Sequence, residues 1–522
     1  MSFVPIRWLI AVTLCFIGVV TYLTRININN AIVDMVREGN ESIQHHNLCP
    51  DKVHSQPKLS LPRSILRRNE ERDRDRFDWD PETQGLVLGS FFWSYVLFHT
   101  PHGYIAGRYG GKVPICIALL VSGIISIVTP AVAHLPSVTY LISLRAVMGI
   151  FQAGIFPGLF VTACNWVPAH ERSTILAVNE AGPSIGLILM QFLSGYLMNA
   201  YSWTILFYAP GVASFIALII VMVFLRNRPE EHPLVSRKEL AYIRRNPDDE
   251  EDEDEEEQEE KETSPLVYRR RGSMREPVPW CRMLTNTSVI VFLFFKFTRA
   301  LAFYLVTSEM PTYFASVLHE DLVSIGIITS TATALTLVSL LVSARIADFL
   351  IEKHFLTRTG TRKLFSLFAG IANAIFLMLI PALRCNRQLV VTAFFIQAIF
   401  YGSQTGSDTP LPAEMTTKFY AVLYAIGIVC SNIPGFLAPM LTGYVLSTVE
   451  DQWIAWSILF YGAGGLLILA TLLFLLLGSA RRQDFDFTSF QSRRQSTTMT
   501  KKSVITSHLY EVGTQRIRAT TA

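Results

Sequence analysis

Charged residues are scarce in this chain of 522 residues, of which 17% are charged and 50% hydrophobic. A soluble domain is usually about 25% charged. The seven cysteines form no CxxC pair and show no spacing typical of a metal site. The sequence also shows no constellation of a catalytic nucleophile, a metal or a phosphate-binding loop. These absences argue against a soluble domain and an enzyme, and we expect no metal, no cofactor and no nucleic-acid partner.

The hydrophobic residues are gathered in long, continuous runs. A run of about 20 residues crosses the roughly 30 Å hydrocarbon core of a bilayer as a helix, whereas the strands of a membrane barrel alternate in hydropathy. The sequence therefore predicts an all-α membrane protein with twelve transmembrane helices in two six-helix halves. The predicted spans are 8–35, 84–107, 112–133, 138–163, 174–198, 202–225, 289–315, 323–349, 362–383, 388–408, 418–446 and 453–478.

A polar segment, 226–288, separates the N-terminal half (1–225) from the C-terminal half (289–478) and contains the acidic run DDEEDEDEEEQEE. Such a segment cannot bury a core, so we expect a disordered cytosolic linker, and a cytosolic tail at 479–522. Basic residues gather in the loops after spans 2, 6, 8 and 12, and most short loops on the other side lack them. The positive-inside rule then places both termini in the cytosol.

The first outer loop, 36–83, is long and carries an Asn-x-Ser glycosylation acceptor at Asn40. Cys49 in this loop and Cys385 both fall on the predicted outer side. This placement permits a disulfide between them, and two unrelated thiols are the alternative.

Three arginines lie inside predicted spans: Arg25 in the first, Arg145 in the fourth and Arg299 in the seventh. An arginine at mid-span costs about 2.5–3.5 kcal/mol on insertion scales and is kept where it faces a cavity or a partner. At 1.5 Å per residue, Arg25 and Arg145 lie about 10 Å below the outer surface and Arg299 about 16 Å from the cytosolic one. We therefore predict that all three converge on a positively charged pocket for anions. Snorkelling of the side chains to the interface is the alternative, and it fits Arg145 better than Arg299.

A charged turn follows the second span of each half, GYIAGRYGGK at 103–112 and ARIADFLIEK at 344–353. The same turn at equivalent places indicates two parallel repeats. We expect Arg108 and Asp348 in these turns to brace the cytosolic side. Twelve spans, two halves and this turn resemble the major facilitator superfamily, in which spans 1, 4, 7 and 10 line a central cavity.

Several motifs narrow the resemblance. RININNAIVDMV, GSFFWSY, RAVMGIFQAGIFPG, PEEHP and FYLVTSEMPTYF resemble, in order, the anion transporters of solute-carrier family 17. That family includes sialin, the vesicular glutamate and nucleotide transporters and the type I phosphate cotransporters. The resemblance covers about residues 8–480 and implies that Arg25, Arg145 and Arg299 bind the anion. It also matches Glu309 to a glutamate of the sialin-like and phosphate branches, and Glu414 to an aspartate before span 11.

The chain departs from this pattern at positions that bear on ion coupling. Gln152, which cannot titrate, stands where proton-coupled members carry a glutamate, and Leu88 where glutamate transporters carry a histidine. His99 and Glu180 stand where relatives are usually neutral. A buried carboxyl or imidazole can exchange a proton near neutral pH, so Glu180 or His99 is a candidate replacement, with Glu309 as a further one. The alternatives are an ion-paired Glu180 and a hydrogen-bonded core histidine at His99.

The sequence thus predicts a monomeric secondary active transporter of small organic or phosphate-bearing anions. It would work by alternating access between the two halves, with a co-transported proton, a sodium ion or the membrane potential alone. We expect it in a vesicular, lysosomal or plasma membrane. Two alternatives stay open: a potential-driven anion uniporter or channel, which Gln152 favours, and a transport-dead sensor that signals through the acidic run 248–260 and the tail.

Overall fold

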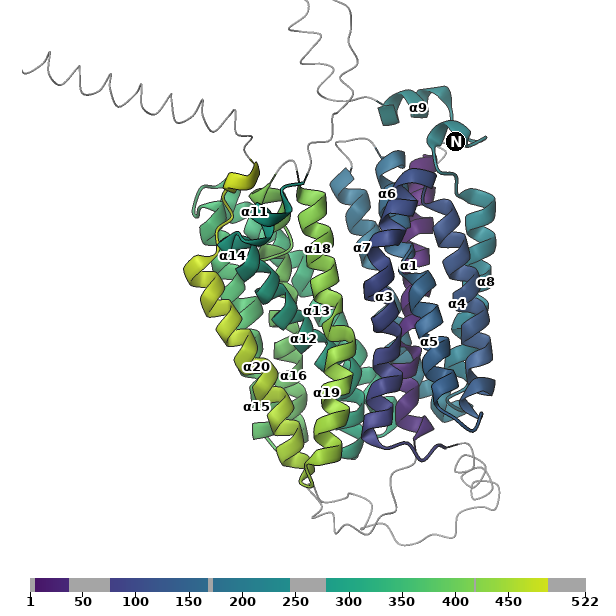
Figure 1. Ribbon diagram of the computed structural model, residues 1–522, viewed down its shortest axis with the longest axis vertical. Helices are drawn as coiled ribbons and strands as arrows, with labels where there is room; N and C mark the ends of the chain where they lie inside the picture. Colours follow the sequence, from purple (N-terminus) through teal and green to yellow (C-terminus); the bar gives the residue numbers. More distant parts are fainter. Residues whose placement is uncertain (1–4, 37–75, 168–171, 245–277, 417–418, 487–522) are drawn as a thin grey trace, which may run out of the picture.

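The computed structural model describes residues 5–36, 76–167, 172–244, 278–416 and 419–486, and nearly all of these are helical (Figure 1). Asn40, Cys49 and the acidic run 248–260 lie outside this part of the chain. Cys385 is in a disulfide, and the other described cysteines are not. The Cys49–Cys385 pairing stays a prediction.

The helices fall into two bundles that lie side by side. The first contains α1 (Ile6–Met35), α3 (Pro81–Tyr109), α4 (Lys112–Ala133), α5 (Thr139–Gln152), α6 (Ile155–Trp166), α7 (Arg172–Ala200) and α8 (Ile205–Phe224), followed by α9 (Arg237–Arg244). The second contains α11 (Trp280–Leu284), α12 (Thr287–Ser316), α13 (Leu322–Glu352), α14 (Arg358–Ser366), the π-helix η4 (Leu367–Ala372), α15 (Asn373–Ala382), α16 (Arg387–Gly402), the 3-10 helix η5 (Ser403–Gly406), α17 (Leu411–Met415), α18 (Tyr420–Asn432), α19 (Pro434–Thr448) and α20 (Gln452–Leu477).

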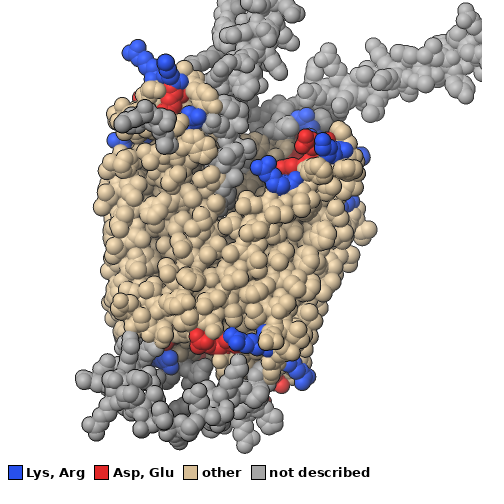
Figure 2. Space-filling view, turned by 180° about the vertical axis from the view of Figure 1, so that it is seen from behind, with Lys and Arg blue, Asp and Glu red and all other residues tan. Residues whose placement is uncertain are grey.

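These helices form a multi-pass membrane protein. Among the described residues, eleven helical segments are long and apolar enough to cross a membrane. Helix α3 is 29 residues long and more polar, and it packs within the bundle against α5 and α19. Figure 2 shows, on the face it displays, a broad belt without lysine, arginine, aspartate or glutamate between two charged ends. The predicted all-α membrane fold is confirmed, and the predicted spans match the helices to within a few residues.

Spans 4 and 10 are broken inside the bundle, and span 11 is also interrupted, at Ile433 between α18 and α19. Helix α5 ends at Gln152 and α6 begins at Ile155 because Pro157 has no N–H to donate to the carbonyl of Ala153. Helix α16 likewise ends at Gly402 and is followed by η5, and α17 begins only after Pro410, with Pro412 in its first turn. A break at membrane depth is tolerated where protein buries it or where it lines a cavity. The functional side chains described below gather around the breaks in spans 4 and 10.

The two halves touch at one end of the molecule and diverge toward the other. We name these ends the Asp80 end, where α3 begins, and the α9 end (Figure 1). A Cβ built on Gly85 of α3 would lie 2.4 Å from the carbonyl oxygen of Pro439 in α19. Gly103 lies eighteen residues further along α3, which is five full turns, so it occupies the same face. A Cβ on Gly103 would meet nothing within 4 Å. The α3 face toward the C-terminal half is therefore sealed at the Asp80 end and uncovered at the α9 end.

Glycines also permit the second contact between the halves, which α7 makes with α13. A Cβ on Gly195 of α7 would lie 2.3 Å from the carbonyl oxygen of Leu322, and one on Gly326 of α13 would lie 2.7 Å from that of Gln191. Small residues let two helix backbones approach this closely. Both contacts lie toward the Asp80 end, so the structure is closed on that side.

We expect Gly85→Ala to open the Asp80 end, because its Cβ forces α3 and α19 apart. The reporter is a cysteine at Ser308, which is buried and accepts a hydrogen bond from Asn29 across the two halves at 3.0 Å. A thiol reagent applied from the Asp80 side, with the native free cysteines replaced, should label it roughly tenfold faster, which corresponds to about 1.4 kcal/mol. Gly103→Ala is the matched control and should leave the labelling rate unchanged. Equal rates for the two variants would contradict the sealed contact.

Candidate functional site

Arg25 of α1 and Arg145 of α5 lie against each other in the N-terminal half. Nη2 of Arg145 is 3.5 Å from the backbone oxygen of Arg25, and the two residues are 2% and 4% exposed, respectively. Neither guanidinium is paired with a carboxylate among the described residues. Arg25 Nη2 and Arg145 Nε are buried and have no hydrogen-bond partner. Two buried cations without a counterion are costly, so the pair has both the charge and the free donors to accept an anion.

Aromatic rings surround the Arg25 guanidinium. Its central carbon lies 4.5–5.4 Å from the ring centroids of Tyr22, Phe91, Tyr95 and Phe156. Arg145 shares the ring of Phe91 at 5.5 Å. Ring faces attract a cation without neutralising it, so these contacts hold the guanidinium groups in place and leave their charge available.

Gln152 occupies the last position of α5 and is fully buried. Its Oε1 accepts from Arg25 Nε at 3.4 Å, and its Nε2 donates to the hydroxyls of Thr24 and Ser122, both at 3.0 Å. The amide therefore orients Arg25 and adds no negative charge. A carboxylate at this place would form an ion pair with Arg25 and compete with a bound anion.

Close packing of α3 on α5 creates this geometry. A Cβ on Gly149 would lie 2.1 Å from the carbonyl oxygen of Phe91, so only glycine permits the approach. The approach brings the Phe91 ring over both guanidinium groups. Ser94 adds a hydrogen bond to the carbonyl oxygen of Ala146 at 2.5 Å. The sequence feature that fixes this cluster is thus Gly149, one turn after Arg145.

Arg299 of α12 belongs to a second cluster, in the C-terminal half. Its Nη2 donates to Asp408 Oδ2 at 3.1 Å and its Nη1 to the Tyr401 hydroxyl at 3.0 Å. Lys296, one turn earlier on α12, places its ammonium 3.8 Å from the same carboxylate oxygen. Arg299, Lys296 and Asp408 are all buried. This cluster carries two positive charges and one negative charge.

An aromatic layer separates the two clusters. Tyr304 of α12 lies near both Arg25 and Tyr401, and its hydroxyl donates to Asn432 at 3.1 Å. The ring contacts are Phe92 with Tyr304 at 5.0 Å and Phe303 with Tyr401 at 5.2 Å. The structure thus brings Arg25 and Arg145 together and places Arg299 across this layer. Convergence of all three on one anion stays a prediction.

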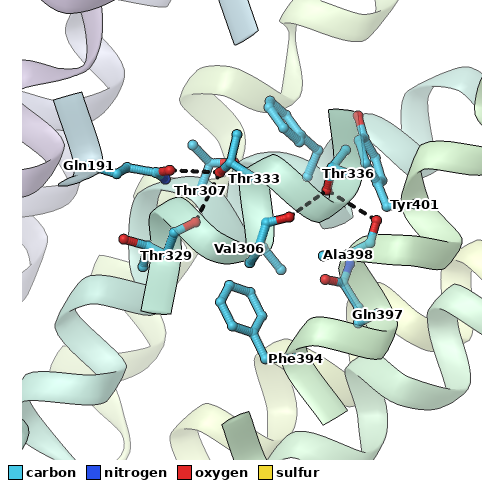
Figure 3. Close-up of a pocket in the computed structure, with 12 residues that line it drawn as sticks. Gln191, Val306, Thr307, Thr329, Thr333, Thr336, Phe394, Gln397, Ala398 and Tyr401 are labelled. Atoms are coloured by element: carbon cyan, nitrogen blue, oxygen red, sulfur yellow. Dashed lines mark hydrogen bonds between the residues drawn. The ribbon is translucent and has the colours of Figure 1, made fainter. Parts of the chain in front are cut away.

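A small cavity of about 40 Å³ adjoins Tyr401 between α7, α12, α13 and α16 (Figure 3). Its walls carry hydroxyl and amide groups from Gln191, Thr307, Thr333 and Gln397. Thr333 donates to Gln191 at 2.6 Å, which links α13 to α7 across the two halves (Figure 3). The cavity has room for water and is far below the 300–1,000 Å³ of a typical ligand pocket.

The candidate coupling residues lie in different places. Nδ1 of His99 is buried without a hydrogen-bond partner, and its ring lies 5.4 Å from that of Tyr95, beside Arg25. Glu309 is buried on α12, and its Oε1 has no partner. Glu180 lies on α7, and its side chain is outside the described ones. His99 is therefore next to the N-terminal arginine pair, whereas Glu309 is a separate buried carboxyl toward the Asp80 end of α12.

The charged turns form no brace in this conformation. Arg108 is exposed and donates to the Tyr104 hydroxyl of its own helix at 3.1 Å. Asp348 is exposed on α13 and makes no ion pair with another described residue. The turns lie at the α9 end, where the halves diverge, so a bracing role needs a different conformation and stays a prediction.

Glu414 is an ion-pair partner inside the C-terminal half. Arg362 of α14 donates to it from Nε and from Nη2, the latter at 2.6 Å, and donates from Nη1 to the carbonyl oxygen of Gly406 at 3.0 Å. This pair fixes the broken end of span 10 against span 9. It is the structural support of the loop that carries Asp408.

Lys296 and Asp408 are site residues that the predictions from the sequence do not include. Both carried the signal that identified the arginines, since each is a charged residue within or beside a predicted apolar span. Lys296 lies three residues before Arg299, and Asp408 is the last residue of the predicted tenth span.

The chain is similar to known proteins over most of its length. Residues 14–357 match the family model of the Major Facilitator Superfamily. The chain is 25% identical to human sialin over 492 residues, which covers 94% of this chain and 92% of sialin. It is 25% identical to a putative inorganic phosphate cotransporter of Drosophila melanogaster (90% and 84% covered) and 23% identical to human vesicular glutamate transporter 2 (86% and 70% covered).

Solved structures show the same fold. The inward-open conformation of the xylose transporter XylE from E. coli superposes with a TM-score of 0.59 at 13% identity, covering 90% of this chain and 96% of that one. The relatives are those that the sequence motifs indicated.

Proposed function

Because the chain belongs to the Major Facilitator Superfamily, we propose that it carries small organic or phosphate-bearing anions across a membrane by alternating access. Arg25 and Arg145 bind the anion, and the observation that supports this role is that their guanidinium groups lie together, buried, with no carboxylate paired to them among the described residues. A guanidinium donates two parallel hydrogen bonds to a carboxylate or phosphate and stays charged at every physiological pH. Two relatives are named for glutamate and for inorganic phosphate, and both of these are anions.

Arg299 is the contribution of the C-terminal half to anion binding. It lies on the far side of the Tyr304 layer, on the span of the second half equivalent to α1. Movement of one half against the other is what changes its distance from Arg25. The Asp80-end contacts at Gly85 and Gly195 must part when the protein opens to that side. We propose that the α9 end, with both described chain ends, faces the cytosol.

Uptake into proteoliposomes tests this function. The purified protein is offered radiolabelled sialate, glutamate, ATP, urate and phosphate, with proton, sodium and voltage gradients imposed one at a time. Saturable uptake of at least one anion is expected. Accumulation above electrochemical equilibrium identifies a secondary active transporter, and equilibration with the voltage alone identifies a uniporter. Absence of saturable uptake of every anion would contradict the proposal.

Gln152→Glu is expected to weaken anion uptake and to add a dependence on pH beyond that of the wild type. The new carboxylate would lie within about 3.4 Å of Arg25 Nε and form an ion pair with it when ionised. We expect KM to rise about tenfold at neutral pH, which equals about 1.4 kcal/mol, and to recover as the carboxyl is protonated at lower pH. Gln152→Met is the matched control, since it removes the amide without adding charge. A KM for Gln152→Glu that equals that of Gln152→Met at every pH would contradict the role of Gln152.

A further inference from the structure

Asp408 is a buried carboxylate in the part of span 10 where the helix is broken. Helix α16 ends at Gly402, η5 covers Ser403–Gly406, and the chain turns at Ser407 with φ −103° and ψ −93°. The Ser343 hydroxyl of α13 bonds Thr405 at 2.8 Å, and Arg362 of α14 holds the Gly406 carbonyl oxygen. These contacts fix the loop, so Asp408 is held in place and is 0% exposed.

One carboxylate oxygen of Asp408 lies beside two cationic side chains. Oδ2 lies 3.1 Å from Arg299 Nη2 and 3.8 Å from Lys296 Nζ, whereas Oδ1 is buried and has no hydrogen-bond partner. Arg299 Nε is also buried without a partner. The cluster therefore carries one uncompensated positive charge and has an unused donor. Uncompensated charge in a buried site is costly, so this arrangement has the capacity for a second anionic group.

The other described groups around this cluster do not supply a second carboxylate for Arg299 and Lys296. Tyr401 of α16 accepts a hydrogen bond from Arg299, and on α18 Tyr424 lies 5.9 Å from the Lys296 ammonium, while the Cys430 thiol also interacts with Lys296. Arg362 of α14 and Glu414 of α17 are paired with each other. Helix α13 contacts the loop before Asp408 through the hydroxyl group of Ser343. Among the described residues, Asp408 is thus the carboxylate that pairs with Arg299 and Lys296.

We propose that Asp408 is an internal competitor of the transported anion and couples its transport to a proton. Ionised Asp408 occupies Arg299 and Lys296. A proton on its carboxyl removes that negative charge, and the two cations then attract the anion that the N-terminal arginines bind. Binding of the anion favours protonation to the same extent, because linkage between two ligands is reciprocal. One proton and one monovalent anion then cross together, without net charge movement. This inference rests on the proposed anion transport.

The position of Asp408 in the C-terminal half matters because Gln152, beside Arg25, cannot exchange a proton. The side chain that orients Arg25 is the amide of Gln152, which has no carboxyl to exchange a proton. The C-terminal half supplies one instead, on the partner of Arg299. The residue proposed to exchange a proton therefore lies in the tenth span, on the other side of the Tyr304 layer from Arg25.

Asp408→Asn tests this coupling because the amide imitates the protonated carboxyl. The protein is reconstituted in liposomes, and whichever of radiolabelled glutamate, sialate or phosphate the wild type transports is the probe. Wild-type uptake is expected to rise at least fivefold when an inward proton gradient is imposed. Asp408→Asn is expected to lose this stimulation and to keep exchange of internal for external anion, at a rate independent of pH. Asp408→Glu keeps a titratable group and should restore the stimulation in part. Asp484→Asn, an exposed aspartate, is the control and should behave as wild type.

The outcomes separate the two proposals. No saturable uptake by the wild type refutes anion transport itself. Uptake by the wild type that ignores the proton gradient, or full stimulation in Asp408→Asn, refutes coupling through Asp408 and leaves anion transport standing. Loss of both stimulation and exchange in Asp408→Asn, in protein with wild-type elution on size exclusion and wild-type thermal stability, assigns Asp408 to positioning Arg299 and also refutes coupling. If Asp408→Asn does not fold, Asp408→Glu decides, since coupling predicts that its pH profile shifts from that of the wild type, and an unchanged profile refutes it.

Discussion

Arg145→Ala is expected to lower kcat/KM for anion uptake by about 100-fold or more, equal to about 2.7 kcal/mol or more. Arg145 is 2% exposed and presents an unused Nε. Its loss removes one of two buried cations and the hydrogen bonds that a guanidinium makes with an anion, each worth about 1.5–3 kcal/mol when charge-assisted. The measurement is initial uptake into proteoliposomes over a range of anion concentrations.

Two further variants make the Arg145 result specific. Arg145→Lys keeps the charge and loses the planar fork, so we expect an intermediate loss of roughly tenfold. Arg237→Ala removes an exposed arginine of α9 and should leave uptake unchanged. Each variant is compared at equal amounts of protein with wild-type elution on size exclusion. Wild-type kinetics in Arg145→Ala would refute the role of the N-terminal pair.

Arg362→Leu is expected to destabilise the C-terminal half by about 3–5 kcal/mol, the usual cost of breaking a buried ion pair by removing one partner. Arg362 is 5% exposed, and its loss leaves Glu414 and the carbonyl oxygen of Gly406 without their donor. For a unit of this size the temperature of half-unfolding should fall by roughly 10 °C. The measurement is the fraction of protein that stays soluble in detergent after heating.

The double variant Arg362→Leu, Glu414→Leu distinguishes a broken pair from a general packing defect. Replacing both partners of a buried pair with apolar residues of similar size is often neutral. We therefore expect the double variant to recover most of the stability that Arg362→Leu loses. Arg358→Ala, an exposed arginine of the same helix, should have no effect. A double variant that is less stable than the single one would contradict this interpretation of Glu414.

Local sequence features were sufficient to predict the spans. Continuous apolar runs fix where helices cross the membrane, and the run 112–133 coincides with α4. The same rule identified Arg25 and Arg145, because an arginine inside an apolar run is conspicuous in the sequence alone. Their contact with each other was also within reach, since their depths in spans 1 and 4 agree.

The contacts of Arg299 could not be predicted from local sequence patterns. Its partner Asp408 is more than a hundred residues away, in a loop that exists because span 10 is broken, and no periodic pattern predicts which broken loop meets which helix. The aromatic layer at Tyr304 likewise depends on how the two halves are placed. Residue counting gives the position of a residue along its helix, whereas the lateral position of that helix among its neighbours is not contained in it.

The most direct measurement is an experimental density map of the protein with a transported anion bound. The account predicts density for the anionic group within about 3 Å of nitrogen atoms of both Arg25 and Arg145, beside the Phe91 ring. It is contradicted if the anion occupies another site while these two guanidinium groups keep only their contacts with Gln152, the Arg25 backbone oxygen and the surrounding rings.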